Sequence, residues 1–567
     1  MMKKLLHAKF GWVIMLLLLV AVNYAFSLFR FRADLTSEKR FTVSQATRNM
    51  LEKLDDRVDI TLMMGGDMPA GFKKLAGGAT DLLNEFKEIS SNNISFRIEK
   101  PGENLDDSAK AALVDSLRML GINATNVKAQ TKEGDGQEEQ LVYPGAVIKY
   151  KDRTMGIDFL QGQNFQDGLN SLNNAEALLE YKLASGIDKI TQDSVPLIGY
   201  LSGNGEPVDY RVYDLIERTL RPNYAFRIIP VDSVAVIPPV FQALLIVKPV
   251  VKFSDAQKLK IDQYVMHGGK VVWMLDNLYA SLDSLQRSEG RFVAFDMGLN
   301  LDDLLFRYGV RINQDLVQDL QCDKIPSVIG SMGDKPQIQL LPWPYFPLLR
   351  NTSGHPITKN LDYVVSQFPQ SIDTVKADGV KKTVLLSSST ESRILNTPAI
   401  VEWASVRNEE DLKKFTRSNI PVVMLLEGRF QSLYANRLTK AMADSFTAAG
   451  LPFKAENEKG TMVVAADGDL LLNGINQTDG PIPMGMNMYT RQQYANREFI
   501  LNTLEYLVGN MGILETRGKD YTLRLLDKTK YEDSKSSWQL LNIVVPVVLV
   551  MLFIALYQYL RKRKYAR

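Results

Sequence analysis

A short glycine-rich loop follows an apolar run near residue 200, and its side chains could contact a ligand. The stretch 197–206 reads LIGYLSGNGE, so Ser202, Asn204 and Glu206 stand where a strand is expected to end. The carboxyl ends of parallel strands are common ligand-binding positions. The loop has neither the GxxxxGK[ST] pattern of a P-loop nor the GxGxxG pattern of a dinucleotide-binding loop. We therefore predict that these three residues contact a ligand or a partner; an ordinary tight connection is the alternative.

Asp276 is a second candidate, at the end of the strand-like run 270–276, KVVWMLD. Residues 243–276 resemble the class I glutamine-amidotransferase fold, in which a cysteine nucleophile lies at a tight turn between strand and helix. The resemblance places Asp276 where that cysteine would stand, and no His-x-Glu pair follows it. Aspartate cannot act as a thiolate nucleophile. The resemblance thus implies a scaffold without its catalytic residues, although Asp276 and Glu206 could in principle form an acid–base pair.

The stretch 340–349, LLPWPYFPLL, interleaves aromatic residues with proline. Proline stiffens the backbone into an extended form, and rigid aromatic side chains are frequent anchors at interfaces. Trp343, Tyr345 and Phe346 are therefore candidate partner contacts. The alternative is that they fill the core of their own domain.

The remaining chemistry-bearing residues form no catalytic or metal-binding pattern. The one cysteine, Cys322, excludes an internal disulfide, and we expect it to be a buried thiol. There is no HExxH and no CxxC pair, so the usual zinc-site patterns are absent from the sequence. We expect His267 to lie at a helix C-terminus, where the helix dipole favours imidazolium. The sequence predicts a protein that is not an enzyme and has no metal or cofactor.

The elements expected in residues 31–192 alternate between strand and helix. Ser44 is a good N-cap for a first helix, and residues 140–160 predict a β-hairpin. The order β-α-β-α-β-β-α resembles a thioredoxin-like fold. Redox thioredoxins carry CxxC after the first strand, whereas here the chain reads MMGGDMPAGF without cysteine. The resemblance implies a scaffold without redox chemistry.

Residues 193–515 predict a second α/β domain. Apolar strand-like runs alternate with helical patterns, which indicates a parallel, doubly wound sheet. Ser254 is the expected N-cap of a helix that ends at Gly268. A long insertion is expected at about 280–395. A chain of 567 residues is long enough for two such domains.

Both ends of the chain contain apolar runs long enough to cross a membrane. Residues 11–29 and 536–560 contain no charged residue, and a spanning helix needs about 20 apolar residues. Basic residues flank both runs, most clearly in the tail RKRKYAR, and basic flanks stay in the cytoplasm. We therefore expect both termini inside and a large periplasmic domain, with a cleaved signal peptide as the alternative for the first run. The predicted organisation is a tail and span at 1–30, domains at 31–192 and 193–515, a stem at 516–535, and a span with a basic tail at 536–567.

Several stretches resemble one family in order along nearly the whole chain. They are DLTSEKRFTVSQAT, IGYLSGNGEP, HGGKVVWMLD, LLPWPYFPL, LLEGRFQSLYANR and NREFILNTLEYL. The chain resembles the gliding-motility-associated substrate-binding (GldG) family, an auxiliary subunit family of ABC transporters in the Bacteroidota. The resemblance implies a partner permease, a cytoplasmic ATPase and a role in gliding motility and secretion. It implies no catalytic residues.

These observations favour a non-catalytic subunit of an inner-membrane ABC transporter, whose ectodomain contacts a periplasmic motility or secretion component or a substrate. A formal net charge of +2, from 67 basic and 65 acidic residues, argues against a nucleic-acid partner. Two alternatives remain open. The first is a periplasmic module that binds a glycan or peptide, and the second is a hydrolase that uses Asp276 and Glu206.

Overall fold

The computed structural model describes residues 42–518 and 528–565, together with Leu17 and Val20, which are helical. Gaps within these ranges leave out residues 104, 131–136, 161–167, 289, 333–334, 404–408, 440–443, 445, 477, 479 and 510. The predicted first span lies outside the described residues apart from Leu17 and Val20. The chain divides into two units, Met1–Lys519 and Asp520–Arg567.

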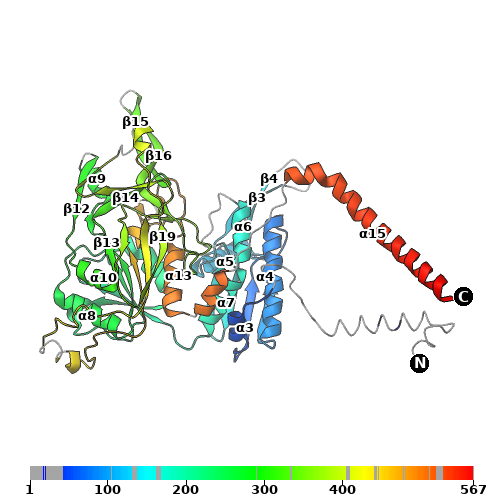
Figure 1. Ribbon diagram of the computed structural model, residues 1–567, viewed down its shortest axis with the longest axis horizontal. Helices are drawn as coiled ribbons and strands as arrows, with labels where there is room; N and C mark the ends of the chain where they lie inside the picture. The colour runs from blue at the N-terminus through cyan, green and yellow to red at the C-terminus, as the bar shows by residue number, and fades with distance from the viewer. Residues whose placement is uncertain are drawn as a thin grey trace. The chain divides into compact units, whose positions relative to one another are not determined.

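A four-stranded mixed sheet forms the N-terminal part of the first unit (Figure 1). Its order is β2-β1-β5-β6, with β1 and β2 parallel and the other pairs antiparallel. The predicted hairpin is confirmed as β5 and β6. A second hairpin, β3 and β4, was not expected from the sequence. The strands are β1 (Val58–Leu62), β2 (Ile94–Ile98), β3 (Thr125–Gln130), β4 (Gln137–Val142), β5 (Gly145–Tyr150) and β6 (Arg153–Asp158).

Helices pack on this sheet through apolar stripes. Phe72, Leu75, Ala79, Leu83 and Phe86 of α4 are buried, and their spacing of three or four residues places them on one helix face. The predicted cap of α3 is confirmed, because the side chain at residue 44 accepts a hydrogen bond from the backbone amide of residue 47. The helices are α3 (Gln45–Leu51), α4 (Ala70–Ile89), α5 (Asp107–Met119), α6 (Gly168–Ala177) and α7 (Leu179–Thr191).

A seven-stranded sheet follows, in the order β19-β22-β23-β10-β9-β7-β8. The five strands from β23 to β8 are parallel, as the alternating pattern predicted, while β22 pairs antiparallel with β23 and β19 pairs antiparallel with β22. These antiparallel strands extend the sheet on the β23 side. The strands are β7 (Leu197–Ser202), β8 (Ala225–Pro230), β9 (Ala243–Val247), β10 (Lys270–Met274), β19 (Val380–Ser387), β22 (Pro421–Gly428) and β23 (Gly460–Ala465).

Both faces of this sheet are covered. In β10, Val272 and Met274 belong to one hydrophobic cluster, while Val271 and Trp273 belong to another. Alternate residues of a strand point to opposite faces, so the continuous apolar run is that of a sheet buried on both sides. The first cluster also contains apolar residues of α13 (Asn496–Val508) and extends to the N-terminal sheet, and the second contains residues of α8 (Asp255–Met266).

Two helices of this part bear directly on the sequence predictions. The predicted Ser254 cap of α8 is confirmed as a capping box with Gln257. Where an ordinary helix was expected after the glycine-rich loop, the chain forms a 3₁₀ turn, η2 (Tyr210–Val212), and a π-helix, η3 (Asp214–Leu220). The Thr219 hydroxyl donates to the Asp214 carbonyl at 2.8 Å, which spans the wider π turn.

The predicted insertion is built of short sheets and helices. Strand β19 lies within it by sequence and joins the main sheet, whereas the others form small separate sheets. They are β12 (Arg291–Asp296), β13 (Val310–Ile312), β14 (Asp315–Asp319), β15 (Cys322–Met332), β16 (Lys335–Leu349), β17 (Val364–Val365), β18 (Ile372–Thr374) and β20 (Ser392–Asn396), with α9 (Leu282–Arg287) and α10 (Asp302–Tyr308). Two more strands of these small sheets, β11 (Leu278–Tyr279) and β21 (Ala399–Glu402), lie just outside the predicted bounds.

Short elements complete the first unit between the main strands and its end. They are η4 (Val231–Ser233), α11 (Glu409–Leu412), η5 (Asp469–Leu471), β24 (Ile475–Asn476), β25 (Gly480–Pro481), α14 (Met511–Glu515) and η6 (Thr516–Gly518).

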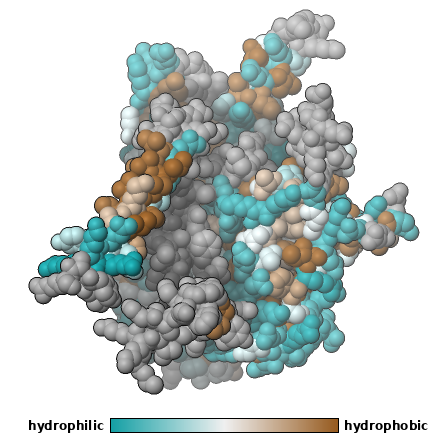
Figure 2. All heavy atoms as spheres, turned by 90° about the vertical axis from the view of Figure 1, so that its right-hand side faces the viewer, coloured by the Kyte–Doolittle hydropathy of each residue, from teal (hydrophilic) through white to brown (hydrophobic). Residues whose placement is uncertain are grey.

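The second unit contains the long helix α15 (Lys528–Tyr565). Its segment Trp538–Arg563 has the length and apolar composition of a membrane-crossing helix, and its most apolar window is not buried. Hydrophobic residues cover the exposed middle of this helix in Figure 2. Pro546 lies inside it without ending it, as happens in membrane helices when other groups satisfy the freed carbonyl.

Candidate functional site

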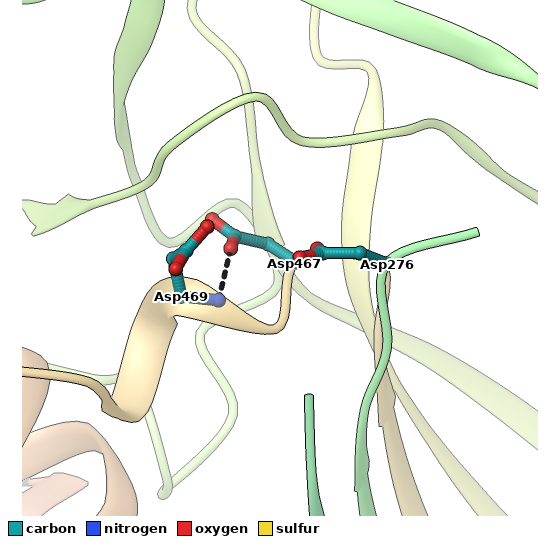
Figure 3. A group of neighbouring side chains, drawn as sticks. All are labelled: Asp276, Asp467 and Asp469. Carbon is teal, nitrogen blue, oxygen red and sulfur yellow. Dashed lines mark hydrogen bonds between the residues drawn. The ribbon is translucent and has the colours of Figure 1, made fainter. Parts of the chain in front are cut away.

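Four charged side chains meet at the carboxyl edge of the seven-stranded sheet. Lys248 follows β9, Asp276 follows β10, and Asp467 and Asp469 follow β23. Because these strands are parallel neighbours, their carboxyl ends lie side by side. One carboxylate oxygen from each aspartate lies within 4.8 Å of the other two. Figure 3 shows the three aspartates, two of them from the loop after β23. We refer to these four residues as the edge cluster.

Lys248 neutralises much of the charge of the edge cluster. Its Nζ lies 3.0 Å from Asp276 Oδ2 and 2.5 Å from Asp469 Oδ2. Burial acts to lower the pKa of Lys248, but the two carboxylates outweigh it and the pKa is raised. The lysine is therefore a permanent cation here and is not suited to act as a base.

Asp467 is fully buried and accepts several hydrogen bonds. Oδ2 accepts from the Ser366 hydroxyl and from the Gln367 amide at 2.8 Å, and Oδ1 accepts from the Asp469 amide at 2.6 Å (Figure 3). Burial, together with the negative charges of Asp276 and Asp469, raises the pKa of Asp467 well above its usual range. This carboxyl therefore keeps its proton to a higher pH than an ordinary aspartate.

The edge cluster resembles a cation site in its ligand types, because carboxylate oxygens suit Mg²⁺ or Ca²⁺. However, the Lys248 ammonium group already contacts two of the three carboxylates. An internal cation and a carboxyl that keeps its proton together offset two of the three negative charges without a metal. We therefore assign the edge cluster a structural role that joins the ends of three strands, and we assign it no metal.

The glycine-rich loop after β7 is held by its own contacts. Ser202 is partly exposed, whereas Asn204 and Glu206 are buried. The backbone N–H of Asn204 donates to Glu206 Oε2 at 2.7 Å, and the side-chain Nδ2 of Asn204 donates to Gln257 Oε1 at 3.1 Å. Burial raises the pKa of Glu206. Asn204 Oδ1 and Glu206 Oε1 have no hydrogen-bond partner among the described residues.

The loop backbone needs glycine at two positions. Gly203 and Gly205 have φ angles of +131° and +82°, values that favour glycine. A Cβ at Gly205 would lie 2.5 Å from a side-chain carbon of Val250. The loop is thus a close-fitting connection. Among the described residues, Glu206 is not part of the carboxylate group that contains Asp276.

Trp343, Tyr345 and Phe346 are buried in the structure, with Trp343 only 2% exposed. They pack around Phe368, and the ring centroid of Trp343 lies 5.5 Å from that of Phe368. Trp343 Nε1 donates to the Trp403 carbonyl at 3.1 Å. In this conformation none of the three rings is exposed for contact with a partner. Together they form a hydrophobic core beneath the small sheets.

Cys322 and His267 do not belong to the edge cluster. Cys322 is half-buried, and burial together with the charges of Asp319 and Asp323 raises its pKa to about 12, which makes it a poor thiolate. His267 is the C-cap of α8, as predicted. The expected preference for imidazolium is wrong, because burial and Lys454 lower the pKa of His267.

The sequence predictions missed three of the four residues of the edge cluster: Lys248, Asp467 and Asp469. A signal was present, because each follows an apolar strand-like run, in ALLIVK and in VVAADGD. Charged residues directly after buried parallel strands meet at one edge of the sheet. What the sequence did not give was the position of β23 beside β10, since nearly 200 residues separate them.

Comparisons with known proteins identify the family. Residues 196–503 match a model of the family described as an ABC-type uncharacterized transport system, and residues 37–149 match a domain of unknown function. An uncharacterized protein of Borreliella burgdorferi is 20% identical over 448 residues, which cover 75% of this chain and 78% of the relative. The solved mmIFT52 N-terminal domain is 12% identical and covers 55% of this chain and 98% of its own, with a TM-score of 0.29, too low to assign a fold. The family match spans more than half of the chain, from β7 into α13, and the chain belongs to the ABC-type uncharacterized transport system family.

Proposed function

We propose that the chain is a non-catalytic auxiliary subunit of an ABC transport complex, anchored in a membrane by α15. The observation that carries the proposal is the family match over residues 196–503, which suggests an auxiliary role and association with transporter components. The apolar segment Trp538–Arg563 supports the anchor, since a 26-residue helix exceeds the 20 or so residues that a bilayer needs.

The chemistry of the described residues supports a non-catalytic role. Asp276, which takes the place of the nucleophile in the amidotransferase resemblance, is paired with Lys248. The cysteine is half-buried with a raised pKa. We therefore propose an amidotransferase-like scaffold at 193–515 and a thioredoxin-like scaffold at 31–192, each kept for its shape.

The finer assignment follows the sequence resemblance. We propose that the partners are a multi-span permease and a cytoplasmic ATPase, and that the complex serves gliding motility and its secretion apparatus. We further propose an inner-membrane location with two spans, both termini in the cytoplasm and the α/β domains in the periplasm. The basic tail RKRKYAR supports this orientation.

A second candidate function is the binding of a glycan or peptide at the loop after β7. The observation that favours it is the pair of buried acceptors, Asn204 Oδ1 and Glu206 Oε1, that have no partner among the described residues. Ligand hydroxyl or amide groups would supply the missing donors. A thermal-shift screen against cell-wall fragments, with Asn204→Ala as the comparison, separates this role from a purely structural one.

The main proposal is tested by isolating the tagged full-length chain from native membranes in a mild detergent. Permease and ATPase subunits are expected at near-stoichiometric amounts. A chain shortened after residue 527 removes α15 and is the control for association through the membrane helix. Recovery of the full-length chain without any transporter subunit, under conditions that keep other ABC complexes intact, would overturn the proposal.

A further inference from the structure

A cavity of about 210 Å³ lies in the first unit between the N-terminal sheet and the seven-stranded sheet. One wall comes from β6 and α7, and the other from residues 221–224 and the end of α13. Pockets for drug-sized ligands measure roughly 300–1,000 Å³. This cavity is smaller and suits a ligand of a few heavy atoms.

Tyr224 lines the cavity and carries a hydroxyl group without a partner. The residue is 6% exposed, and its Oη has no hydrogen-bond partner among the described residues. Burial and the charge of Glu505 raise the pKa of Tyr224, so the phenol keeps its proton and remains a donor. A buried donor left unsatisfied costs about 1–3 kcal/mol. The hydroxyl group is thus a buried donor that no described residue uses.

Five charged side chains line the same cavity, and the positive ones are in excess. Arg153, Lys189 and Arg221 are cationic, while Asp188 and Glu505 are anionic, so the sum is 3 − 2 = +1. Asp188 Oδ2 accepts from the side-chain amide of residue 192 at 2.7 Å. Arg153 Nη1 already donates to the Gln192 carbonyl at 2.6 Å, and Arg221 Nε lies 3.2 Å from Glu217 Oε1, so a ligand would use the remaining N–H groups of both guanidiniums.

Glu505 is already supplied with donors from α7. Its oxygens accept from the Tyr181 hydroxyl at 2.7 Å, the Ser185 hydroxyl at 2.6 Å and Lys189 Nζ at 3.4 Å. The lysine contact is the longest of the three. The ammonium group has two further protons, and a ligand acceptor can take one of them.

We propose that this cavity binds a small oxyanion, a carboxylate or a phosphate, through Tyr224, Lys189 and the guanidinium groups of Arg153 and Arg221. Charge-assisted hydrogen bonds to such anions are the stronger kind. The bound anion would bridge α7 and the segment before β8, and so would join the N-terminal sheet to the seven-stranded sheet. This site is independent of the edge cluster and of the transporter assignment.

Isothermal titration of the purified full-length chain with inorganic phosphate and with succinate tests this proposal. Sodium chloride at matched ionic strength corrects for screening. We expect saturable binding of at least one anion. The anion that binds shows whether the site accepts a phosphate or a carboxylate. Tyr224→Phe and Lys189→Met should each weaken binding at least tenfold, while Lys73→Met, at an exposed lysine paired with Asp67, should bind as the wild type does.

Unfolding midpoints check that the Tyr224→Phe and Lys189→Met variants fold. If either does not, Arg221→Gln, at a largely exposed position, replaces it and should likewise weaken binding. The proposal is overturned if neither anion binds beyond the chloride control. It is also overturned if folded Tyr224→Phe and Lys189→Met bind as tightly as the wild type. Co-isolation of transporter subunits tests the proposed function separately, because neither result of the anion titration bears on it.

Discussion

Lys248 and Asp276 form an ion pair at the carboxyl ends of neighbouring parallel strands, with Nζ 3.0 Å from Oδ2. Asp276 Oδ1 in turn accepts from the Gly468 amide at 2.6 Å, so the pair also reaches the loop after β23. Three consecutive strands of the sheet are thereby joined at one edge. At this edge one lysine is shared between two carboxylates, so it offsets only part of their charge.

Lys248→Met should destabilise the first unit by about 3–5 kcal/mol, because it leaves Asp276 and Asp469 as buried carboxylates without their cation. Urea unfolding of the full-length chain in detergent measures the change. Lys252→Met is the matched control, since Lys252 is exposed, and its effect should stay within about 0.5 kcal/mol. Equal stability of the two variants would show that the ion pair does not hold the strand ends.

The raised pKa of Asp467 predicts that the stability of the fold decreases as the pH rises. The pKa is raised in the folded state by burial and by Asp276 and Asp469, and it returns to about 4 in the unfolded chain. The protonated group thus stabilises the fold fully below about pH 4, and this contribution is lost as pH rises through the folded-state pKa. Asp467→Asn is neutral at every pH, so its stability should fall less than that of the wild type between pH 5 and pH 8.

The control for this titration is Asp373→Asn, at an exposed aspartate paired with Arg311. Its stability should follow the pH profile of the wild type. Parallel profiles for Asp467→Asn and the wild type would contradict the assignment of a raised pKa to Asp467.

Glu505 should be important for holding α7 against α13. Burial acts to raise its pKa, but Lys189 and the hydroxyls of Ser185 and Tyr181 outweigh it, so the pKa of Glu505 is lowered. Glu505→Gln removes the negative charge that these donors stabilise. We expect the free energy of unfolding to fall by about 3 kcal/mol. Hydrogen exchange should show faster opening of α7. Glu515→Gln, at an exposed position, should leave that exchange unchanged.

Trp343→Ala should destabilise the part of the chain between β11 and β21 by about 3–5 kcal/mol, as for other buried aromatic truncations. The ring lies against those of Tyr345, Phe346 and Phe368, so its removal opens a cavity among them. Phe306→Ala, at a side chain that is 54% exposed, is the comparison and should cost far less. A wild-type unfolding midpoint for Trp343→Ala, with loss of a binding partner, would instead favour an interface role.

Leu552→Arg, near the middle of α15, should weaken membrane insertion. An arginine at the centre of a spanning helix costs roughly 2.5–3.5 kcal/mol on insertion scales. Extraction of membranes with alkaline carbonate should release more of this variant than of the wild type. Gln558→Arg lies close to the basic tail and should remain membrane-bound; release of both variants in the same proportion as the wild type would count against α15 as a span.

Local patterns predicted much of the main sheet and little of its surroundings. The strands β7, β9 and β10 and the helix cap at Ser254 could be predicted because apolar runs and capping residues act over a few positions. The π-helix Asp214–Leu220 could not, because its wider turn depends on the hydrogen bond from Thr219 to residue 214 and on tertiary contacts.

The candidate site shows the same division. Asp276 could be placed at a strand end from its own run of residues, whereas Lys248 and Asp469 became its neighbours only through the strand order β23-β10-β9. Strand order is set by long-range packing that single-sequence periodicity does not contain. The aromatic residues at 343–346 were ambiguous for a related reason, since composition alone does not tell whether an apolar segment faces a core or a partner.

The most direct test is to measure ATP hydrolysis by the purified full-length chain and by the complex isolated with it from native membranes. We predict that the isolated complex hydrolyses ATP, that the activity co-elutes with a separate ATPase subunit, and that the chain alone shows none. ATP hydrolysis by the chain alone, or a native complex that contains the chain but no ATPase, would contradict the assignment as a non-catalytic auxiliary subunit of an ABC transporter.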